Sequence, residues 1–540
     1  MKTVIVGGLA GGMSAATRLR RLDESADIVV FERGAHVSFA NCGLPYFVGG
    51  VIAERSDLLL QTPESLAARF RLDVRVLHEV TSIDRMGTVV QVRNLANGET
   101  RFEPYDSLVL AAGASARELQ GADRRTFTLR TVDDVDGITA LLDAGPASPS
   151  AVVVGGGFIG LEAVDNLVRR GVGTSLVHRG PRLFGHLDPE LSSLVLDELI
   201  ANGVDVHLNS TIARIDPATV TLADGTELAA DLIIHAAGIV PDVGMAEAAG
   251  LRIGPAGGIR VDSDQRTSDP AIFAVGDGVE KIGAVDGAPE LVAMAGLANR
   301  HGRAAADAIA GRPHPNRPAL GTAVIGVFSK TVATVGWSET RLRTAGRPFR
   351  TIHTHPFSHA TYYPGAEQMA IKLLIDPRDD AILGAQIVGG EGVDKRIDVI
   401  ATAMSAGITS SALQDLELAY APQYGSAKDP INMLGYVAEN LAAFPDSTIQ
   451  WHELVDALAR GDHLVDVRSP EEFAAGHIPD AVNIPLEQLS GRHTEIDGGL
   501  IVHCQVGQRG HTATRMLAQL GRRVRNLDGG YLTWRAGVRP

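Results

Sequence analysis

The chain of 540 residues contains only two cysteines, Cys42 and Cys504, so it cannot carry the disulfide framework of a small secreted domain. No stretch approaches the roughly 18 consecutive apolar residues that a membrane-spanning helix needs. The N-terminal sequence MKTVIVGGLAGG has glycines where the apolar core of a signal peptide would continue. These absences predict a cytoplasmic protein in a reducing compartment.

The chain has fewer basic than acidic residues, with 49 Lys and Arg against 64 Asp and Glu, which gives a formal net charge of −15. This balance argues against a general nucleic-acid-binding protein, although a local basic pocket stays possible. With no long apolar run, we expect no membrane partner either. Hydrophobic residues make up 45% of the chain and charged residues 21%, as in ordinary globular proteins. The length predicts about three or four domains.

The first 32 residues follow the pattern of a dinucleotide-binding unit. A β-branched strand over 2–6 precedes the glycine-rich turn 7–12, a helix is expected over 13–21, and a second strand over 27–31 ends at Glu32. Glycines let the backbone approach a pyrophosphate at a helix N-terminus, and an acid about 20 residues on holds a ribose hydroxyl. Leu9 stands in place of the middle glycine, so we expect this turn to differ slightly from the usual one.

The same pattern recurs with a complete motif at Gly155, Gly157 and Gly160, between a strand over 151–154 and a helix over 161–170. The following strand, 174–177, ends at His178 and Arg179 rather than at an acid. A cation there can accept a 2′-phosphate, which favours NADPH, but a solvated charge at the strand end is an equal alternative for Arg179.

Three further segments complete an ordered set: the small-residue strands 107–114 and 231–238, and the strand that ends in Gly276-Asp277. The set resembles the pyridine nucleotide-disulfide oxidoreductase family over about residues 1–445. The resemblance implies FAD at the first site and NAD(P)H at the second, where Gly160 favours NADH and Arg179 NADPH, so that both are expected. The implied cofactor-binding residues are Gly7, Gly8, Ala10, Gly11, Gly12, Glu32, Arg33, Asn41, Ala111, Gly113, Gly155, Gly157, Gly160, His178, Arg179, Gly238, Gly276 and Asp277.

The lone Cys42 lies in the stretch SFANCGLPYF, residues 38–47, which resembles the coenzyme A-disulfide reductase branch of this family. A single thiolate can form a mixed disulfide, a persulfide or a sulfenic acid. We expect backbone N–H groups of a tight turn to stabilise it. The resemblance implies that coenzyme A or its derivatives contact Ser14, Arg18, Arg21, Ser38, Asn41 and Lys428. For the helix arginines, a solvated helix end is an equal alternative.

Residues 319–444 resemble the dimerisation domain of the family and contain the motifs HATYYPGA and ELAYAPQYGSAKDP. Tyrosine can donate a proton to a leaving thiolate. The resemblance implies catalytic roles for Tyr362 and Tyr420, the second supplied by a partner subunit in a homodimer. Tyr363 is the competing choice for the first position. His353, His355 and His359 lack a completing Cys or carboxylate in the sequence, so we expect interface or solvent histidines and no metal.

After residue 446 the flavoprotein motifs end, and the remainder resembles one rhodanese domain. A strand over 500–503 leads into the loop Cys504-Gln505-Val506-Gly507-Gln508-Arg509 and a helix expected to start near residue 511. Loop N–H groups and the helix dipole would stabilise a thiolate or persulfide on Cys504, with Arg509 adding positive charge. Asp466 and Arg468 are expected to be structural rather than catalytic.

The predicted fold class is therefore α/β, with two Rossmann-like dinucleotide-binding domains, an α+β dimerisation domain and a C-terminal rhodanese α/β domain. The expected boundaries are 1–115 with 268–318 for FAD, 116–267 for NAD(P)H, 319–445 for dimerisation and 448–540 for rhodanese.

The predicted function is FAD-dependent reduction of coenzyme A persulfide, polysulfide or coenzyme A disulfide by NAD(P)H through Cys42, while Cys504 handles sulfane sulfur. Two alternatives stay open. One is an NAD(P)H oxidase or peroxidase that uses a Cys42 sulfenic acid, and the other is a redox-sensing or sulfur-carrier protein.

Overall fold

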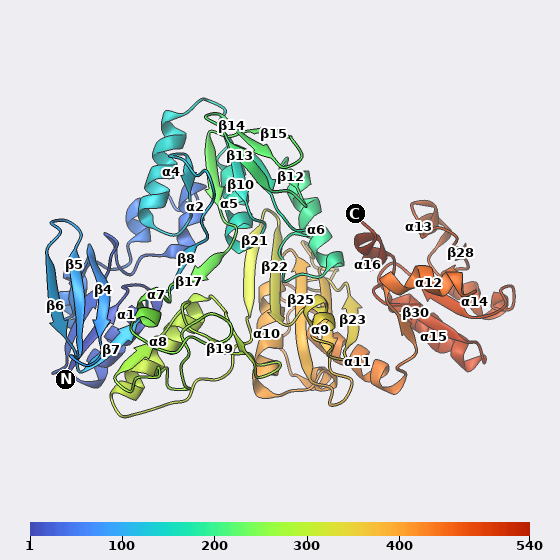
Figure 1. Cartoon of the computed structure of the whole chain (residues 1–540). Helices are drawn as coiled ribbons and strands as arrows, with labels where there is room; N and C mark the ends of the chain where they lie inside the picture. Colours follow the sequence, from blue (N-terminus) through green and yellow to red (C-terminus); the bar gives the residue numbers. More distant parts are fainter. Residues whose placement is uncertain (540) are drawn as a thin grey trace. The chain divides into compact units, whose positions relative to one another are not determined.

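The computed structural model describes residues 1–539 (Figure 1). The chain divides into two compact units. The first unit contains residues 1–179 and 209–321, and the second contains residues 180–208 and 322–540. No helix among the described residues combines the length and the apolar character needed to span a membrane.

The first unit contains two parallel sheets. In the first sheet, the strand order is β18 (Ile272–Ala274), β7 (Ser107–Leu110), β1 (Lys2–Val6), β2 (Asp27–Phe31) and β3 (Asp73–Arg75). Helices α1 (Ala10–Leu22) and α8 (Ala295–Ile309) pack against each other beside it. The β-branched residues of β1 are buried because this strand is central in the sheet.

The second parallel sheet contains β11 (Gly173–Val177), β10 (Ser150–Val154), β16 (Leu232–His235) and β9 (Thr126–Phe127), with α4 (Val132–Ala144) and α5 (Phe158–Arg169). Two antiparallel meanders accompany the sheets. They are β4 (His78–Asp84), β5 (Val89–Asn94) and β6 (Thr100–Pro104), and β13 (Ile212–Ile215), β14 (Thr219–Leu222) and β15 (Glu227–Ala229). The short elements of this unit are η1 (Asn41–Gly43), α2 (Leu44–Val48), η2 (Arg55–Leu58), α3 (Pro63–Phe70), β8 (Ala114–Ala116), β17 (Ile239–Pro241), α7 (Gly244–Ala248), β19 (Lys281–Ile282) and β20 (Pro289–Glu290).

The second unit has an antiparallel sheet in the order β21 (Ala323–Val327), β22 (Lys330–Gly336), β25 (Ile382–Gly389), β24 (Ala370–Ile375) and β23 (Arg350–Thr354). Strand β25 is buried along its whole length. The remaining elements of this part are α6 (Pro189–Ala201), β12 (Asp205–His207), α9 (Glu339–Thr344), α10 (Val393–Ala406), η3 (Ser411–Asp415) and α11 (Pro430–Ala443).

The C-terminal part of the second unit is a parallel sheet in the order β26 (Thr448–Ile449), β30 (Val524–Leu527), β29 (Leu500–His503), β27 (His463–Asp466) and β28 (Val482–Asn483). Its helical elements are η4 (Trp451–Glu453), α12 (Leu454–Ala459), α13 (Pro470–Ala474), α14 (Leu486–Arg492), α15 (Gln508–Gln519) and α16 (Gly530–Gly537). Helix α13 begins with proline after a Ser469–Glu472 capping box, which fixes its start.

Three predicted helix starts were too late in the sequence. Helix α1 begins at Ala10 rather than Met13, α5 begins at Phe158 rather than Leu161, and α15 begins at Gln508 rather than near residue 511. In each case, the residues just before the predicted start already belong to the first turn. The N-terminal N–H groups of these helices therefore lie closer to the glycine-rich turn and to Cys504 than the sequence suggested.

Candidate functional site

The two glycine-rich turns of the first unit have the same close backbone contacts. Gly7 and Gly155 adopt φ values of +107° and +113°, and a Cβ on either would lie 2.3 or 2.4 Å from the carbonyl oxygen of Ala111 or Ala236. A Cβ on Gly12 or on Gly160 would lie 1.9 or 1.8 Å from the carbonyl oxygen of the first glycine of its own turn. Only glycine fits these positions, so each helix starts close against its strand.

The expectation that Leu9 changes the first turn is wrong. Leu9 is the N-cap of α1 with φ −104° and ψ −153°, and Gly157 is the N-cap of α5 with φ −98° and ψ −166°. The middle position of the motif therefore uses an extended conformation that any residue can adopt. Leu9 adds a side chain at the rim of the turn without altering the backbone.

Glu32 and His178 occupy equivalent places beside the two glycine-rich turns of the first unit. The Gly8 N–H donates to Glu32 Oε2 at 2.8 Å, and the Gly34 N–H donates to Glu32 Oε1 at 2.8 Å. At the second site, the Gly156 N–H donates to His178 Nδ1 at 3.1 Å. Because Nδ1 accepts this bond, the proton of a neutral His178 is on Nε2. The first site thus offers an anchored carboxylate acceptor, and the second offers a donor.

The carboxylate of Asp277 follows strand β18 and is partly buried, and this burial raises its pKa. Lys281 Nζ donates to the carbonyl oxygens of Gly276 and Val279 at 2.6 and 2.8 Å, which holds the turn that presents Asp277. Burial lowers the pKa of Lys281 to about 8. An anchored Glu32 at one end and Asp277 at the other provide acceptors for the hydroxyl groups of a ribose and a ribityl chain, so these residues fit FAD.

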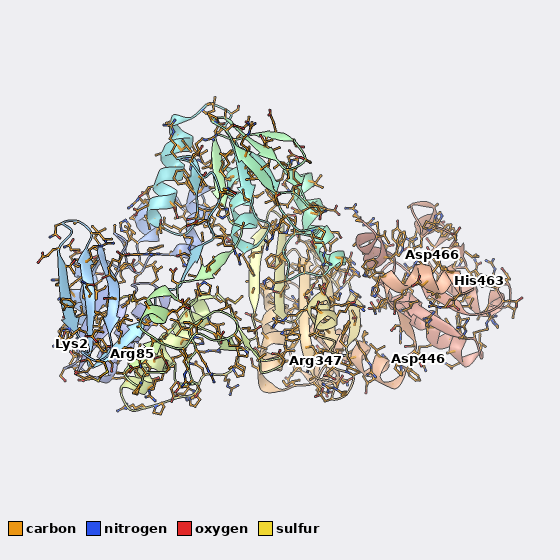
Figure 2. The ribbon with its side chains drawn as sticks, in the orientation of Figure 1. Lys2, Arg85, Arg347, Asp446, His463 and Asp466 are labelled. Atoms are coloured by element: carbon orange, nitrogen blue, oxygen red, sulfur yellow. The ribbon has the colours of Figure 1, made fainter. Side chains whose placement is uncertain are left out.

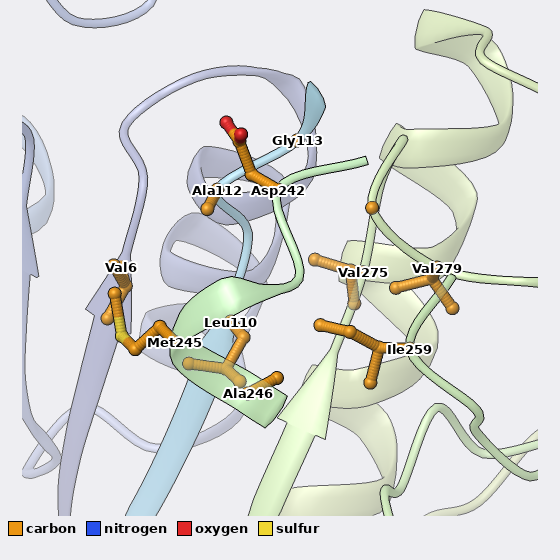
Figure 3. A pocket seen from close by; sticks show the side chains of 11 residues that line it. Val6, Leu110, Ala112, Gly113, Asp242, Met245, Ala246, Ile259, Val275 and Val279 are labelled. Carbon is orange, nitrogen blue, oxygen red and sulfur yellow. The ribbon is translucent and has the colours of Figure 1, made fainter. Parts of the chain in front are cut away.

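A small cavity lies where the segments after β1, β7 and β18 converge (Figure 3). Its lining includes Val6, Leu110, Gly113 and Val275, and its volume is about 10 Å³. That is room for about one water molecule, so the cavity is a packing defect beside the nucleotide turn and not a dinucleotide pocket.

The other residues implied for cofactor binding lie on the loops around these turns. Gly113 and Gly238 have positive φ values of +76° and +101° after β7 and β16. Arg33 lies 3.8 Å from Asp242 as an exposed ion pair. Six more lie either just after a strand of one of the two parallel sheets or in the first turn of α1: Gly8, Ala10, Gly11, Ala111, Arg179 and Gly276.

Cys42 is exposed and lies in the one-turn helix η1, directly before α2. Its N–H donates to Asn41 Oδ1 at 3.0 Å, and its Sγ lies 3.7 Å from the same oxygen. Desolvation by the surrounding protein raises the pKa of the thiol, and the carboxylates of Glu162 and Asp277 raise it further. The expectation of a thiolate stabilised by backbone N–H groups is therefore wrong for this structure.

Glu162 and Tyr46 are two further polar residues near Cys42 that were not among the predicted site residues. Glu162 lies on α5, two residues after Gly160, and accepts a hydrogen bond from the Tyr46 hydroxyl at 3.2 Å. Burial raises the pKa of Glu162, and it also raises the pKa of Tyr46 to about 12. The helix that carries Glu162 starts at the second glycine turn, and its carboxylate helps raise the pKa of Cys42. The sequence signal that could have identified Glu162 is its position among the apolar residues of the predicted helix.

The residues implied for coenzyme A do not form one free face. Arg18 Nε donates to Asp307 Oδ1 at 2.6 Å, and Ser14 donates to Asn299 at 2.6 Å, so both side chains are engaged by α8. Arg21 instead lies over the ring of Phe70, 5.8 Å from its centroid. Ser38 adopts φ +45°, an uncommon value outside glycine, and Lys428 is exposed. Arg18 is therefore an ion-paired residue rather than a solvated helix end.

Tyr362 and Tyr420 come together in the second unit. Their hydroxyl oxygens are 2.7 Å apart, and both rings are exposed. Tyr363 lies edge-on to His359, with ring centroids 5.6 Å apart. The structure thus pairs the two tyrosines within one chain, so the expectation that Tyr362 and Tyr420 come from different subunits is wrong, and Tyr363 has a packing contact.

The expectation of interface or solvent histidines is wrong for His353. Its ring is buried between two carboxylates, with Nδ1 at 2.8 Å from Asp528 and Nε2 at 2.9 Å from Glu190. Burial opposes protonation, but hydrogen bonds to Asp528 and Glu190 prevail and raise the pKa of His353 to about 9. His353 therefore joins β23, α6 and the segment before α16 as a cation.

Three buried carboxylates, from Asp188, Glu190 and Glu339, lie within 4.8 Å of one another. Lys372 Nζ lies among them, at 3.1, 2.5 and 2.7 Å. These acids raise the pKa of the buried lysine despite its desolvation. The cluster is an ion-pair network centred on an ammonium group.

Cys504 follows β29 and is completely buried, and its carbonyl oxygen accepts from the Tyr531 N–H at 2.9 Å. The loop ends at Gly507, which has φ +90° and caps α15. Arg509 donates to both carboxylate oxygens of Glu472, at 2.7 and 2.6 Å, and this contact together with Cys504 raises the pKa of Arg509. The sulfur atom thus lies at a helix N-terminus beside a guanidinium group.

Arg468 connects the loop after Cys504 to Asp466 at the end of β27. It forms a fork with Asp466, with Nε and Nη2 at 3.0 and 2.7 Å from Oδ2, and donates to Gln505 Oε1 at 2.9 Å. Its guanidinium group also lies over the ring of Tyr531, 4.6 Å from the centroid. These contacts are those of a buried structural arginine.

Comparisons with known proteins match this architecture segment by segment. Residues 1–297 match the model described as pyridine nucleotide-disulphide oxidoreductase, residues 322–429 its dimerisation domain, and residues 450–537 a rhodanese-like domain. A coenzyme A disulfide reductase from Staphylococcus aureus is 36% identical over 440 residues, covering 81% of this chain and 100% of that protein.

Two solved structures extend the similarity through the C-terminal part. Reduced Bacillus anthracis CoADR-RHD has a TM-score of 0.97 and 42% identity, covering 99% of this chain and 98% of its own. An NAD-dependent persulfide reductase from A. fulgidus has a TM-score of 0.92 and 34% identity, covering 99% and 100%.

Proposed function

Because the chain belongs to the pyridine nucleotide-disulphide oxidoreductase family, we propose that it reduces coenzyme A persulfide, polysulfide or coenzyme A disulfide at Cys42 with NAD(P)H. The observation that carries this proposal is the position of Cys42. It is exposed, close to the buried carboxyls of Glu162 and Asp277, and no second cysteine lies near it in the sequence. Its partner sulfur must therefore come from a substrate.

Glu32 and Asp277 would hold FAD at the first site, and the turn at Gly155 with His178 and Arg179 would hold NAD(P)H. FAD bound there would supply two-electron chemistry, by which electrons taken as hydride from NAD(P)H could reach a nearby sulfur. The cation of Arg179 suits a 2′-phosphate and Gly160 favours NADH, which supports the use of both nucleotides.

Cys42 supplies the nucleophile. Its thiolate attacks coenzyme A disulfide, forming a Cys42–S–S–coenzyme A bond and releasing one coenzyme A thiolate. Two electrons and one proton then regenerate the Cys42 thiolate and release the second coenzyme A as a thiol. With coenzyme A persulfide, the same attack at the coenzyme A sulfur releases hydrosulfide instead. The thiol of Cys42 has a raised pKa, so its deprotonation precedes attack.

Tyr362 and Tyr420 would donate the proton to the departing thiolate, in a homodimer built through residues 319–445. The short contact between the two hydroxyl groups supports a hydrogen-bonded pair, in which one tyrosine donates to the other and the second can donate its proton to the thiolate. Cys504 would carry sulfane sulfur as a persulfide and pass it to coenzyme A by thiol exchange. Arg509 stabilises the anion there.

The two cysteine variants test this proposal. Cys42→Ser is expected to abolish reduction of every sulfur substrate, while NAD(P)H still bleaches the flavin spectrum. Cys504→Ser is expected to keep reduction of coenzyme A disulfide and to lose thiosulfate sulfurtransferase activity. Turnover of coenzyme A persulfide at the parent rate by Cys42→Ser would overturn the assignment. Consumption of oxygen or peroxide in preference to sulfur substrates would favour the oxidase alternative.

A further inference from the structure

A hollow of about 870 Å³ lies between the segment 443–447 and the C-terminal sheet. Five arginines line it, Arg460, Arg515, Arg522, Arg523 and Arg525, together with two aspartates, Asp446 and Asp462. The hollow therefore has a formal excess of three positive charges in a chain whose net charge is −15. Such a local reversal of sign attracts anions.

The hollow is separate from the sulfur site. Arg525 is near the start of β30, and Asp462 directly precedes β27, so these residues lie at the amino end of the parallel strands. Cys504 follows the carboxyl end of β29. Figure 2 labels both ends of β27, His463 at the end of the hollow and Asp466 at the end of the Cys504 loop. A four-residue strand separates the two ends by about 10 Å.

The arginines differ in what already binds them. Asp462 accepts from Arg523 and Arg525, both at 2.7 Å, and Arg522 donates to the His493 carbonyl at 2.7 Å. These three guanidinium groups are therefore fixed in position, and Arg523 still has 74% of its side chain exposed.

The remaining two arginines, Arg460 and Arg515, can bind a ligand. The Arg515 guanidinium lies 3.5 Å from the centroid of the Phe444 ring, which is 41% exposed. Across the part of the chain that the structure describes, neither Arg460 nor Arg515 has a side-chain hydrogen-bond or ion-pair acceptor. Their planar donor forks are thus free for a ligand, next to an aromatic surface.

We propose that this hollow binds a small organic molecule that carries at least two phosphate groups and a planar ring. Guanidinium groups bind phosphate oxygens through paired donors, and the fixed arginines would hold one phosphate while the free ones hold the next. The Phe444 ring offers a stacking surface for the planar part. The volume lies within the range of small-molecule pockets, whereas a protein partner needs a broad, flatter face.

The test is equilibrium dialysis of the FAD-loaded full chain with ADP, which counts ADP molecules bound per chain. The parent is expected to bind one more ADP than the double variant Arg460→Ser/Arg515→Ser, or to bind it about tenfold or more tightly. Arg492→Ser, an exposed arginine of the same domain paired with Glu495, is the matched control and should bind as the parent does. Because the double variant also loses the contact between Arg515 and Phe444, its fold is checked separately. Its circular dichroism spectrum and its sulfurtransferase activity should both equal those of the parent.

Inorganic tripolyphosphate and a hexaglutamate peptide complete the design. Tripolyphosphate should compete with ADP at this site but bind more weakly than ADP, because it lacks the ring. Equal stoichiometry and affinity for ADP in the parent and the double variant would overturn the proposal. So would binding of hexaglutamate without ADP, because that result indicates an acidic protein partner.

Discussion

The buried His353 should make the stability of the second unit depend on pH. Its pKa rises from an ordinary 6.5 to about 9, because Asp528 and Glu190 bind both ring nitrogens. A group whose pKa is raised by folding contributes stability that is complete below the unfolded value and is lost as the pH rises through the folded value. This rise in the pKa of His353 corresponds to about 3 kcal/mol of folding stability, which is lost between about pH 6.5 and 9.

The neighbouring His355 acts in the opposite direction. Burial lowers its pKa to about 3, and it bonds to Thr533 at 2.7 Å in the neutral state. Below pH 6.5 the unfolded chain takes up a proton that the folded His355 cannot hold, so folding weakens there. Together the two histidines place the maximum of their joint contribution near pH 6.5.

Urea unfolding of the full chain, followed by tryptophan fluorescence at pH 6.5, 7.5, 8.5 and 9.5, measures this effect. The quantity to compare at each pH is the difference in unfolding free energy between the parent and His353→Gln, because subtraction removes all other titrating groups. We expect the difference to shrink by about 3 kcal/mol from pH 6.5 to 9.5. His314→Gln, at an exposed histidine, is the control. A difference that stays constant over this range would refute the reasoning.

Three further predictions concern the first unit. Arg179→Glu should move the ratio of kcat/KM values from NADPH toward NADH, because it replaces a phosphate partner with a ribose partner, and an unchanged ratio would assign Arg179 to the solvated surface. Glu162→Gln should lower the pKa of Cys42, because one carboxylate near the thiol is lost, and the pH dependence of alkylation by iodoacetamide measures this shift. An unaltered alkylation profile would show that desolvation alone sets the pKa. Gly160→Ala should abolish NAD(P)H binding but keep FAD, since its Cβ would lie 1.8 Å from the Gly155 carbonyl oxygen; nucleotide titration and the flavin spectrum test both halves, and normal binding would contradict the close-contact argument.

The sequence predicted the parallel sheets well, because buried strands and glycine turns obey local rules. It failed where the answer depends on residues distant in the chain. His353 was expected at an interface or in solvent because nothing near it in sequence suggests Glu190 or Asp528. Glu162 was missed for a similar reason, since its partner Tyr46 lies 116 residues away.

The error at Leu9 has another origin. The motif was interpreted as a requirement for glycine at three positions, whereas the structure requires it at the first and third, where a Cβ would meet backbone. The middle position has an extended N-cap conformation open to any residue. The start of α1 was predicted late because glycines occupy its first turn, where glycine is tolerated when the helix must lie close to a neighbouring strand.

The ion-pair network around Lys372 has a consequence for how the chain is made. Lys372 follows its partner Glu190 by 182 residues, and Asp528 follows His353 by 175. At 5–20 residues per second, a ribosome needs roughly 10 to 35 s to make either stretch. The acids Asp188 and Glu190 at the start of α6 are therefore made long before their cationic partners, His353 on β23 and Lys372 on β24. The final place of α6 is reached late in synthesis, while the nucleotide-binding strands on either side of it in sequence have already been made.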